Sequence, residues 1–181
     1  MRALVGAAIL GAALLGCTKP RSEPPEASAA RAKAVLVPFQ TELKAALENA
    51  IAAGGAEPAI EACSSVAPAL AAKASTGGMT VGRTSAKLRN PKNAAPSWVG
   101  PAMAELAAAK KEGDYRVVPL PGGKVGYAET ILVKPKCLLC HGDKVSPGVA
   151  AKLADKYPND AARGYSEGEF RGVSWVELPP P

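Results

Sequence analysis

Cys137-Leu138-Leu139-Cys140-His141 has the form C-x-x-C-H, which is the attachment signature of c-type haem. In such a site the two thiols add to the haem vinyl groups as thioethers, and the adjacent imidazole ligates the iron. One helical turn places both sulfurs and the ring on one side of the backbone. The chain has 181 residues with four cysteines, and its one histidine lies inside the motif. We therefore predict one covalent haem c on Cys137 and Cys140, with His141 as the proximal iron ligand.

Three other interpretations of the motif are a structural disulfide, a thiol-disulfide redox pair and a zinc site. A structural zinc site needs four ligands, which here would have to include the distant Cys63. A redox pair usually opens a helix after a strand and does not need the histidine that follows. We favour haem over a disulfide or redox pair, and either of these over a metal.

Length and composition predict one domain with a thin core. Aromatic residues make up 4% of the chain, and a buried porphyrin would add apolar surface that the side chains do not supply. The net charge of +6 is spread along the chain. Because no basic patch is interleaved with aromatics, we expect no nucleic-acid partner; acidic redox proteins or anionic lipid suit the charge better. The motif has no acid–base constellation beside it, so we do not expect an enzyme.

The N-terminal sequence predicts export and a lipid anchor. Residues 3–15 form an apolar run that is too short to span a bilayer and ends in Leu14-Leu15-Gly16-Cys17. This resembles a bacterial lipoprotein signal, in which cleavage precedes the cysteine and its sulfur carries diacylglycerol; an ordinary secretory signal is the alternative. We predict a signal peptide over 1–16, lipidation of Cys17, and a flexible tether over 17–33, which is rich in Pro, Ser, Ala and charge.

Both N-terminal interpretations agree with the haem motif, because haem c is attached outside the cytoplasmic membrane. We therefore expect a periplasmic, lipid-anchored protein. The residue after Cys17 is Thr18 rather than aspartate, which favours the outer membrane over the inner one.

The remainder, residues 34–178, is predicted to be one α+β domain with a small antiparallel sheet flanked by helices. In the helix expected over about 58–73, Cys63 shares one face with apolar neighbours three and four residues away, and Pro68 should kink or restart that helix. The other expected helices begin near Pro38, Ser97 (as N-cap) and Pro147. The expected strands cover 81–85, 115–120, 125–133 and 169–176.

A series of short segments in this domain has a familiar order: Ala59–Cys63 with Ala67-Pro68, Val81–Ser85, Arg89-Asn90-Pro91 with Asn93, Cys137–Gly142, Tyr157–Asp160 with Gly164-Tyr165, and Gly168 with Arg171-Gly172. Together they resemble the DUF3365 family, also called the Tll0287-like domain, over roughly residues 60–176. The resemblance implies a PAS-like fold with covalent haem c and His/Cys axial ligation. It also implies that Cys63 is the second iron ligand, since Cys63 is the cysteine of the matching A-I-x-x-C segment.

The residues alone leave that second ligand open, because Cys63, Met79, Met103, a lysine or an empty position would each be compatible with one histidine. A methionine ligand raises the reduction potential, and a thiolate lowers it. Arg83 and Arg89 lie between the two ligands in sequence. They are candidate partners for the haem propionates, because arginine binds carboxylates with paired hydrogen bonds; ordinary surface ion pairing is the alternative for each.

Two functions are compatible with this sequence. A membrane-tethered redox or gas sensor would use a displaceable Cys63, opened by reduction or by NO or CO, and would pass its signal to a separate protein partner. The alternative is a simple periplasmic electron-transfer cytochrome with a redox partner. Rapid uptake of CO by the reduced form would favour the sensor.

Overall fold

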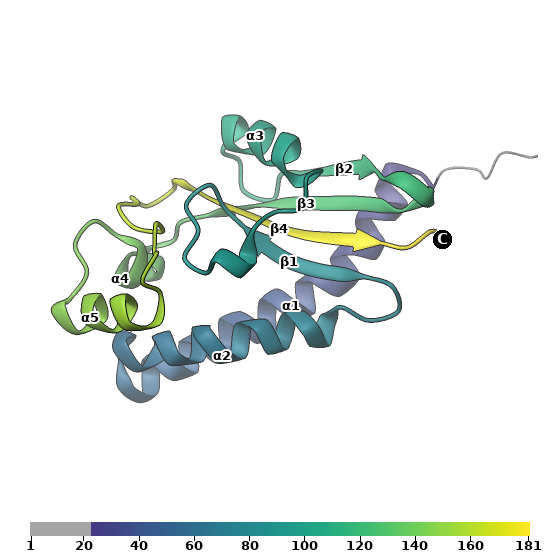
Figure 1. Cartoon of the computed structure of the whole chain (residues 1–181). Coiled ribbons are helices and arrows are strands. Elements are labelled where there is room, and N and C mark those ends of the chain that lie inside the picture. The colour runs from purple at the N-terminus through teal and green to yellow at the C-terminus, as the bar shows by residue number, and fades with distance from the viewer. Residues whose placement is uncertain (1–22) are drawn as a thin grey trace, which may run out of the picture.

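The computed structural model describes residues 23–181, so the expected signal peptide and Cys17 lie outside the described residues. The described part forms a four-stranded antiparallel sheet with helices on both faces (Figure 1). The predicted α+β class, a small antiparallel sheet flanked by helices, is thereby confirmed.

The sheet has the strand order β1-β4-β3-β2. Its strands are β1 (Thr80–Thr84), β2 (Tyr115–Pro119), β3 (Val125–Leu132) and β4 (Phe170–Leu178). β2 and β3 form a hairpin through the turn at Pro121–Gly123. β4 then enters between β1 and β3 and pairs with both. All four expected strands are present, with ends that differ by one or two residues.

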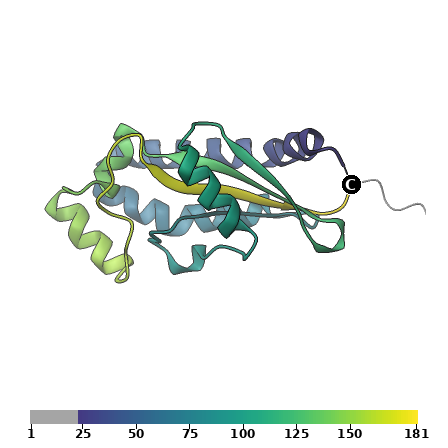
Figure 2. The same cartoon turned by 90° about the horizontal axis from the view of Figure 1, so that it is seen from above.

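Two long helices cover one face of the sheet, and a shorter one covers the other (Figures 1 and 2). The long pair is α1 (Pro25–Gly54) and α2 (Ala56–Ala74), which meet at Gly55. The opposite face carries α3 (Val99–Ala109), which follows the 3-10 turn η1 (Pro91–Asn93). At one end of the sheet lie the 3-10 turn η3 (Pro135–Cys137), α4 (Leu138–His141) and α5 (Pro147–Lys156).

The expected flexible tether is wrong from Pro25 onward, because α1 begins there and the folded domain therefore starts before residue 34. Pro25 occupies the first helical turn, where its missing N–H costs nothing. Ala29, Ala32 and Leu36 then recur at helical spacing and are buried against the sheet. Small alanines carry that stripe, so it resembled a polar linker in the sequence.

Two local expectations about the helices are also corrected. α2 continues through Pro68 without restarting. Ser97 does not cap α3, since the N-cap residue is Trp98 and makes no side-chain capping bond.

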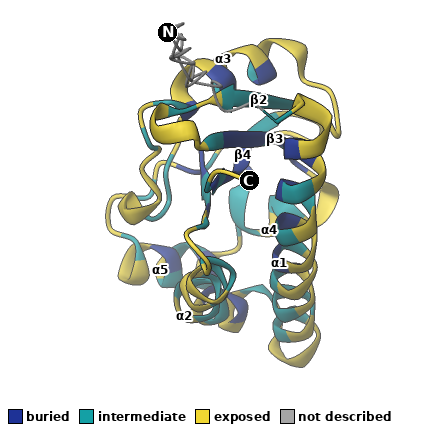
Figure 3. Ribbon diagram, turned by 90° about the vertical axis from the view of Figure 1, so that its right-hand side faces the viewer, coloured by how far each residue is buried: buried dark blue, intermediate teal, exposed yellow. Residues whose placement is uncertain are grey.

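The core consists of two layers, one on each face of the sheet (Figure 3). Val81, Tyr127 and Val176 pack against α1, whereas Val173 and Trp175 pack against α3. Side chains alternate between faces along a strand. Arg83 and its cross-strand partner Ser174 therefore project from the same face as Val81 and Val176, toward the layer of α1 and α2.

Gly172→Ala should destabilise the fold by about 3 kcal/mol, the upper end of the usual cost of overpacking. Gly172 has φ +150°, and a Cβ there would clash with the carbonyl oxygen of Thr84, a backbone atom that cannot rotate away. Gly100→Ala is the matched control, because a Cβ at Gly100 meets nothing within 4 Å and alanine favours its helix. Urea unfolding of both variants would measure the difference; equal midpoints would contradict the expected clash.

Candidate functional site

The C-x-x-C-H motif lies where β3 leaves the sheet, on the turn formed by η3 and α4. Cys137, Cys140 and Cys63 are free, half-buried thiols in the described structure. Cys137 packs against the small cluster of Val133, Ala162 and Tyr165. The predicted helical turn is thus present, and the loop containing residues 157–169 holds it in place.

His141 is bound to that loop through its ring and its backbone. The ring Nδ1 lies 2.8 Å from the carbonyl oxygen of Ala162, and the backbone N–H of Tyr165 donates to the His141 carbonyl at 3.0 Å. A carbonyl can only accept, so Nδ1 carries the proton and Nε2 keeps its lone pair. Burial, together with the charges of Arg89 and Arg171, lowers the pKa of His141 to about 3. The ring is therefore neutral, and the lone pair of Nε2 is free to ligate a metal.

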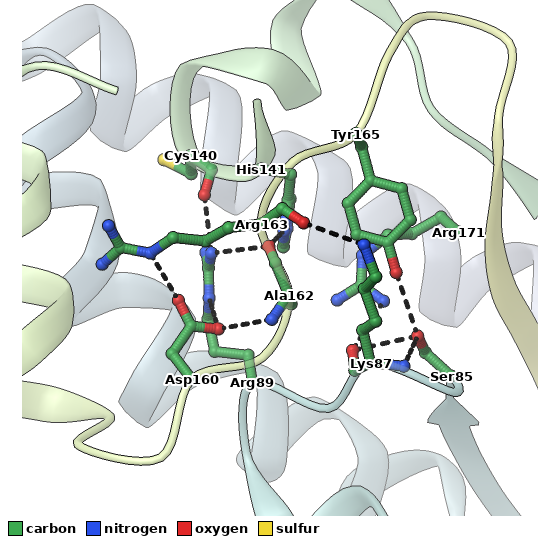
Figure 4. Close-up of polar contacts among 10 residues, drawn as sticks. All are labelled: Ser85, Lys87, Arg89, Cys140, His141, Asp160, Ala162, Arg163, Tyr165 and Arg171. Carbon is green, nitrogen blue, oxygen red and sulfur yellow. Dashed lines mark hydrogen bonds and ion pairs between the residues drawn. The ribbon is translucent and has the colours of Figure 1, made fainter. Parts of the chain in front are cut away.

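Arg89 connects the motif to the same loop (Figure 4). Its Nη2 donates to the carbonyl oxygens of Cys140 at 2.6 Å and Ala162 at 3.2 Å, and its Nε donates to Asp160 at 3.1 Å. Asp160 also accepts from the backbone N–H of Ala162 at 2.9 Å and from Arg163 Nε at 3.1 Å. The residue predicted to contact a propionate thus uses two of its three nitrogens inside the protein, and its propionate role stays a prediction.

Asp160→Ala should cost about 3–5 kcal/mol near neutral pH, since it leaves a buried guanidinium without its partner. The Asp160 side chain is 4% exposed and that of Arg89 13%. Burial alone would raise the pKa of Asp160, but hydrogen bonds from Arg89, Ala162 and Arg163 lower it below its ordinary value. A lowered pKa gives stability that is complete above the unfolded-state pKa and disappears as pH falls through the folded one.

The difference in unfolding free energy between wild type and Asp160→Ala should therefore be full at pH 6 and shrink as the pH falls below about 4. Urea unfolding followed by circular dichroism across this pH range would measure it. Asp155→Ala on α5 is the control, because Asp155 is exposed and its loss should change stability by no more than about 0.5 kcal/mol. A difference that stayed constant down to pH 2 would contradict the ion pair.

Cys63 lies in α2, one helical turn after Ile60, and Ile60 packs in the cluster of α5 residues that Cys140 also borders. Burial raises the pKa of the Cys63 thiol, while the positive charges of Arg83 and Arg89 oppose this rise. The two arginines predicted from the sequence are thus both close enough to act on Cys63. Of the other ligand candidates, Met103 packs in the α3 cluster on the opposite face of the sheet, and Met79 packs against the α1 core.

The site contains positive charge without a matching anion. Burial lowers the pKa of the Arg83 and Arg171 guanidinium groups, and neither forms an ion pair with a carboxylate among residues 23–181. Ser174, opposite Arg83 in the sheet, is 1% exposed and its hydroxyl makes no hydrogen bond in the described structure. Buried polar groups are normally paired, so this surface is suited to an anionic ligand.

Tyr165 lies between the histidine and two cations. Its ring meets the His141 ring edge-on at 6.3 Å, and Lys87 Nζ and the Arg171 guanidinium carbon lie 4.9 and 5.3 Å from its centroid. Its hydroxyl is 3.5 Å from Ser85 Oγ. Stacking cations on an aromatic face is favourable, so Tyr165 holds the two cations beside His141 (Figure 4).

Sequence reasoning gave no role to Asp160, Ala162, Tyr165 or Arg171. Three of them are side chains in the segments that carry the family resemblance, which was the available signal, whereas Ala162 acts through a backbone carbonyl. No three His, Cys, Asp or Glu side chains converge as metal ligands in the part of the chain that the structure describes, and a structural zinc site would need four ligands.

The fold and this site define an α+β protein with a C-x-x-C-H turn at the end of one strand and a cysteine-bearing helix beside it. A family model described as Tll0287-like matches residues 22–179, and the chain therefore belongs to the Tll0287-like family.

A solved structure described as "Crystal structure of the cyanobacterial heme-protein Tll0287" is similar in fold, with a TM-score of 0.60. It is 24% identical, and the match covers 87% of this chain and 97% of that chain. At this identity the likeness bears on the fold alone. No curated protein matches the chain.

Proposed function

We propose that this protein is an exported, membrane-tethered mono-haem c-type protein that acts as a redox or gas sensor. The observation that carries the proposal is the hydrogen bond from His141 Nδ1 to the Ala162 carbonyl, made on the same turn as the free thiols of Cys137 and Cys140. It leaves Nε2 as the free ring nitrogen. The similar cyanobacterial structure is also described as a haem protein.

The residues present fit a covalently held haem. Cys137 and Cys140 would form the thioethers and His141 Nε2 would ligate the iron, with Cys63 as the second ligand. Arg83 and Arg171, which have no carboxylate partners in the described structure, would pair with the propionates. Bound haem would supply a one-electron iron couple and a position at which a diatomic gas can bind.

A sensor role is supported by the helix that carries Cys63. The C-terminal half of α2 packs against α1 through Leu70, Ala71 and Ala74, and Lys73 forms an ion pair with Glu42 at 2.8 Å. If NO, CO or reduction displaced the Cys63 sulfur, α2 would be free to shift against α1. Because α1 begins at Pro25, eight residues after the predicted anchor Cys17, that shift would reach a signalling partner near the membrane.

The reaction of the reduced protein with CO distinguishes the sensor function from the electron-transfer function. We expect rapid CO uptake by the full-length protein purified from a host with cytochrome c maturation, and a matching change in the protection of α2 amides from hydrogen exchange. A reduced form that resists CO and exchanges electrons rapidly with itself would favour electron transfer. A colourless product from that host would contradict both.

The tether rests on Cys17. No helix of the described residues is long and apolar enough to cross a bilayer. Under the proposal, mass spectrometry of the mature protein shows an N-terminal, acylated Cys17, and the protein fractionates with the outer membrane. An unmodified N-terminus beyond Cys17 would contradict the anchor and leave the haem proposal untouched.

A further inference from the structure

The Ala162 carbonyl oxygen receives two donors from different parts of the chain. His141 Nδ1 lies 2.8 Å from it, and Arg89 Nη2 lies 3.2 Å from it. The same Arg89 nitrogen is 2.6 Å from the carbonyl oxygen of Cys140, the residue before His141. The Arg89 guanidinium therefore contacts two carbonyl oxygens. One belongs to the residue before His141, and the other orients the His141 ring.

Asp160 holds both parts of this arrangement. Its Oδ1 accepts from Arg89 Nε at 3.1 Å and from the N–H of Ala162 at 2.9 Å. Its side chain is 4% exposed. One carboxylate oxygen therefore binds both the arginine and the residue whose carbonyl faces His141, so the position of Asp160 helps to set the position of each.

We propose that Arg89 and Asp160 are positioning residues for the iron-ligating imidazole, and that they fix the His141 tautomer and ring orientation through the Ala162 carbonyl. This rests on the proposed haem function. Outer hydrogen bonds of this kind orient a ligating histidine and set its donor strength. Arg89 adds a buried positive charge beside the ligand, which favours the reduced iron. Arg89 is thus assigned a positioning role toward the histidine, beside the propionate contact that the sequence predicts.

The sequence offers a matched control in Arg163. Arg163 Nε binds the other oxygen of Asp160 at 3.1 Å, yet it has no hydrogen bond to Cys140 or Ala162 carbonyl oxygens in the described structure. Arg163→Gln and Arg89→Gln remove the same charge from the same carboxylate. Only Arg89→Gln should shift the reduction potential of the haem-loaded full chain downward and broaden the low-spin EPR signal that reports ring orientation.

A second readout needs no haem. Because the chain has one histidine, ¹⁵N-histidine labelling gives the spectrum of a single ring. Full-length wild type and Arg163→Gln should show the Nδ1–H tautomer, whereas Arg89→Gln and Asp160→Asn should show it lost or mixed with the Nε2–H form. Arg89→Lys keeps the positive charge but lacks the planar guanidinium that reaches two carbonyl oxygens. Compared with Arg89→Gln, it should restore the reduction potential in part and leave the tautomers mixed.

The outcomes separate this proposal from the haem proposal. If wild type binds no haem but the tautomers follow this pattern, the positioning pair stands and the haem function falls. If haem is bound and Arg89→Gln keeps the wild-type potential, or shares a single tautomer with Arg163→Gln, the positioning role is overturned. Circular dichroism of each variant identifies any that do not fold, and Asp160→Asn, which keeps an acceptor for the Ala162 N–H, then supplies the deciding tautomer measurement.

Discussion

Replacing Cys137 and Cys140 together by alanine is expected to abolish covalent haem. The two thiols lie on one turn with His141 and are not joined to each other, so each is available to add to a vinyl group. Without both sulfurs, haem would be held by axial ligation and packing alone, which denaturant removes. Haem staining after denaturing electrophoresis, with intact mass spectrometry of the same sample, would show the loss as complete.

Cys63→Ala is the control for this experiment, because it removes a thiol from the same site but from α2 rather than from the motif. It should keep full covalent staining. Each single variant, Cys137→Ala or Cys140→Ala, should keep one thioether and reduced staining. A wild-type protein from its own cells with Cys137 and Cys140 joined as a disulfide, and no porphyrin mass on their peptide, would contradict the whole proposal.

The sheet was predictable because its residues carry local signals. β2 and β3 are rich in β-branched and aromatic residues and are separated by Pro121-Gly122-Gly123, where Gly122 and Gly123 adopt positive φ. The strand order was not predictable, since β4 pairs with both β1 and β3 over long sequence separations. Nothing in a strand's own composition states which neighbours it will have.

The start of α1 was missed because hydrophobicity patterns weigh large side chains. Ala29 and Ala32 bury little area each, yet they let the helix lie close to the sheet, where they are 4% and 0% exposed. Other contacts that hold this end of α1 are tertiary, since Arg31 binds both Glu23 and the carbonyl oxygen of Pro179 at the far end of the chain. A propensity argument over residues 17–33 does not contain this information.

The motif residues of the site were predictable from their spacing in the sequence. The groups that contact them were not. His141, Cys137 and Cys140 are linked by a local turn, whereas Arg89 meets Cys140 across 51 residues of sequence. The key acceptor, the Ala162 carbonyl, belongs to a residue whose side chain carries no chemistry. Arg83 was identified as a candidate anion contact and Arg171 was not, although both are partly buried and have no carboxylate partner in the described structure.

Cys63→Ala is expected to raise the reduction potential by on the order of 100 mV, part of the roughly 0.8 V that axial ligands set across haem proteins. A thiolate donates electron density and stabilises the oxidised iron, so its loss favours the reduced form. Arg83 and Arg89, whose positive charges act on Cys63, would then remain without the thiolate's negative charge, which raises the potential further. Spectroelectrochemical titration would give the potential, and the ferric absorption spectrum should lose its thiolate bands.

Ser64→Ala is the matched control, because it truncates the next residue of α2, whose hydroxyl binds, within residues 23–181, only the Glu61 carbonyl of the same helix. It should leave the spectrum and the potential at their wild-type values. Cys63→Met separates ligation from charge: a ligating methionine would raise the potential further than alanine and slow CO binding, since the sixth position would again be filled. If Cys63→Ala and Ser64→Ala gave the same spectrum as wild type, Cys63 would be a structural thiol, and displacement of its sulfur would no longer be available as the sensor's switch.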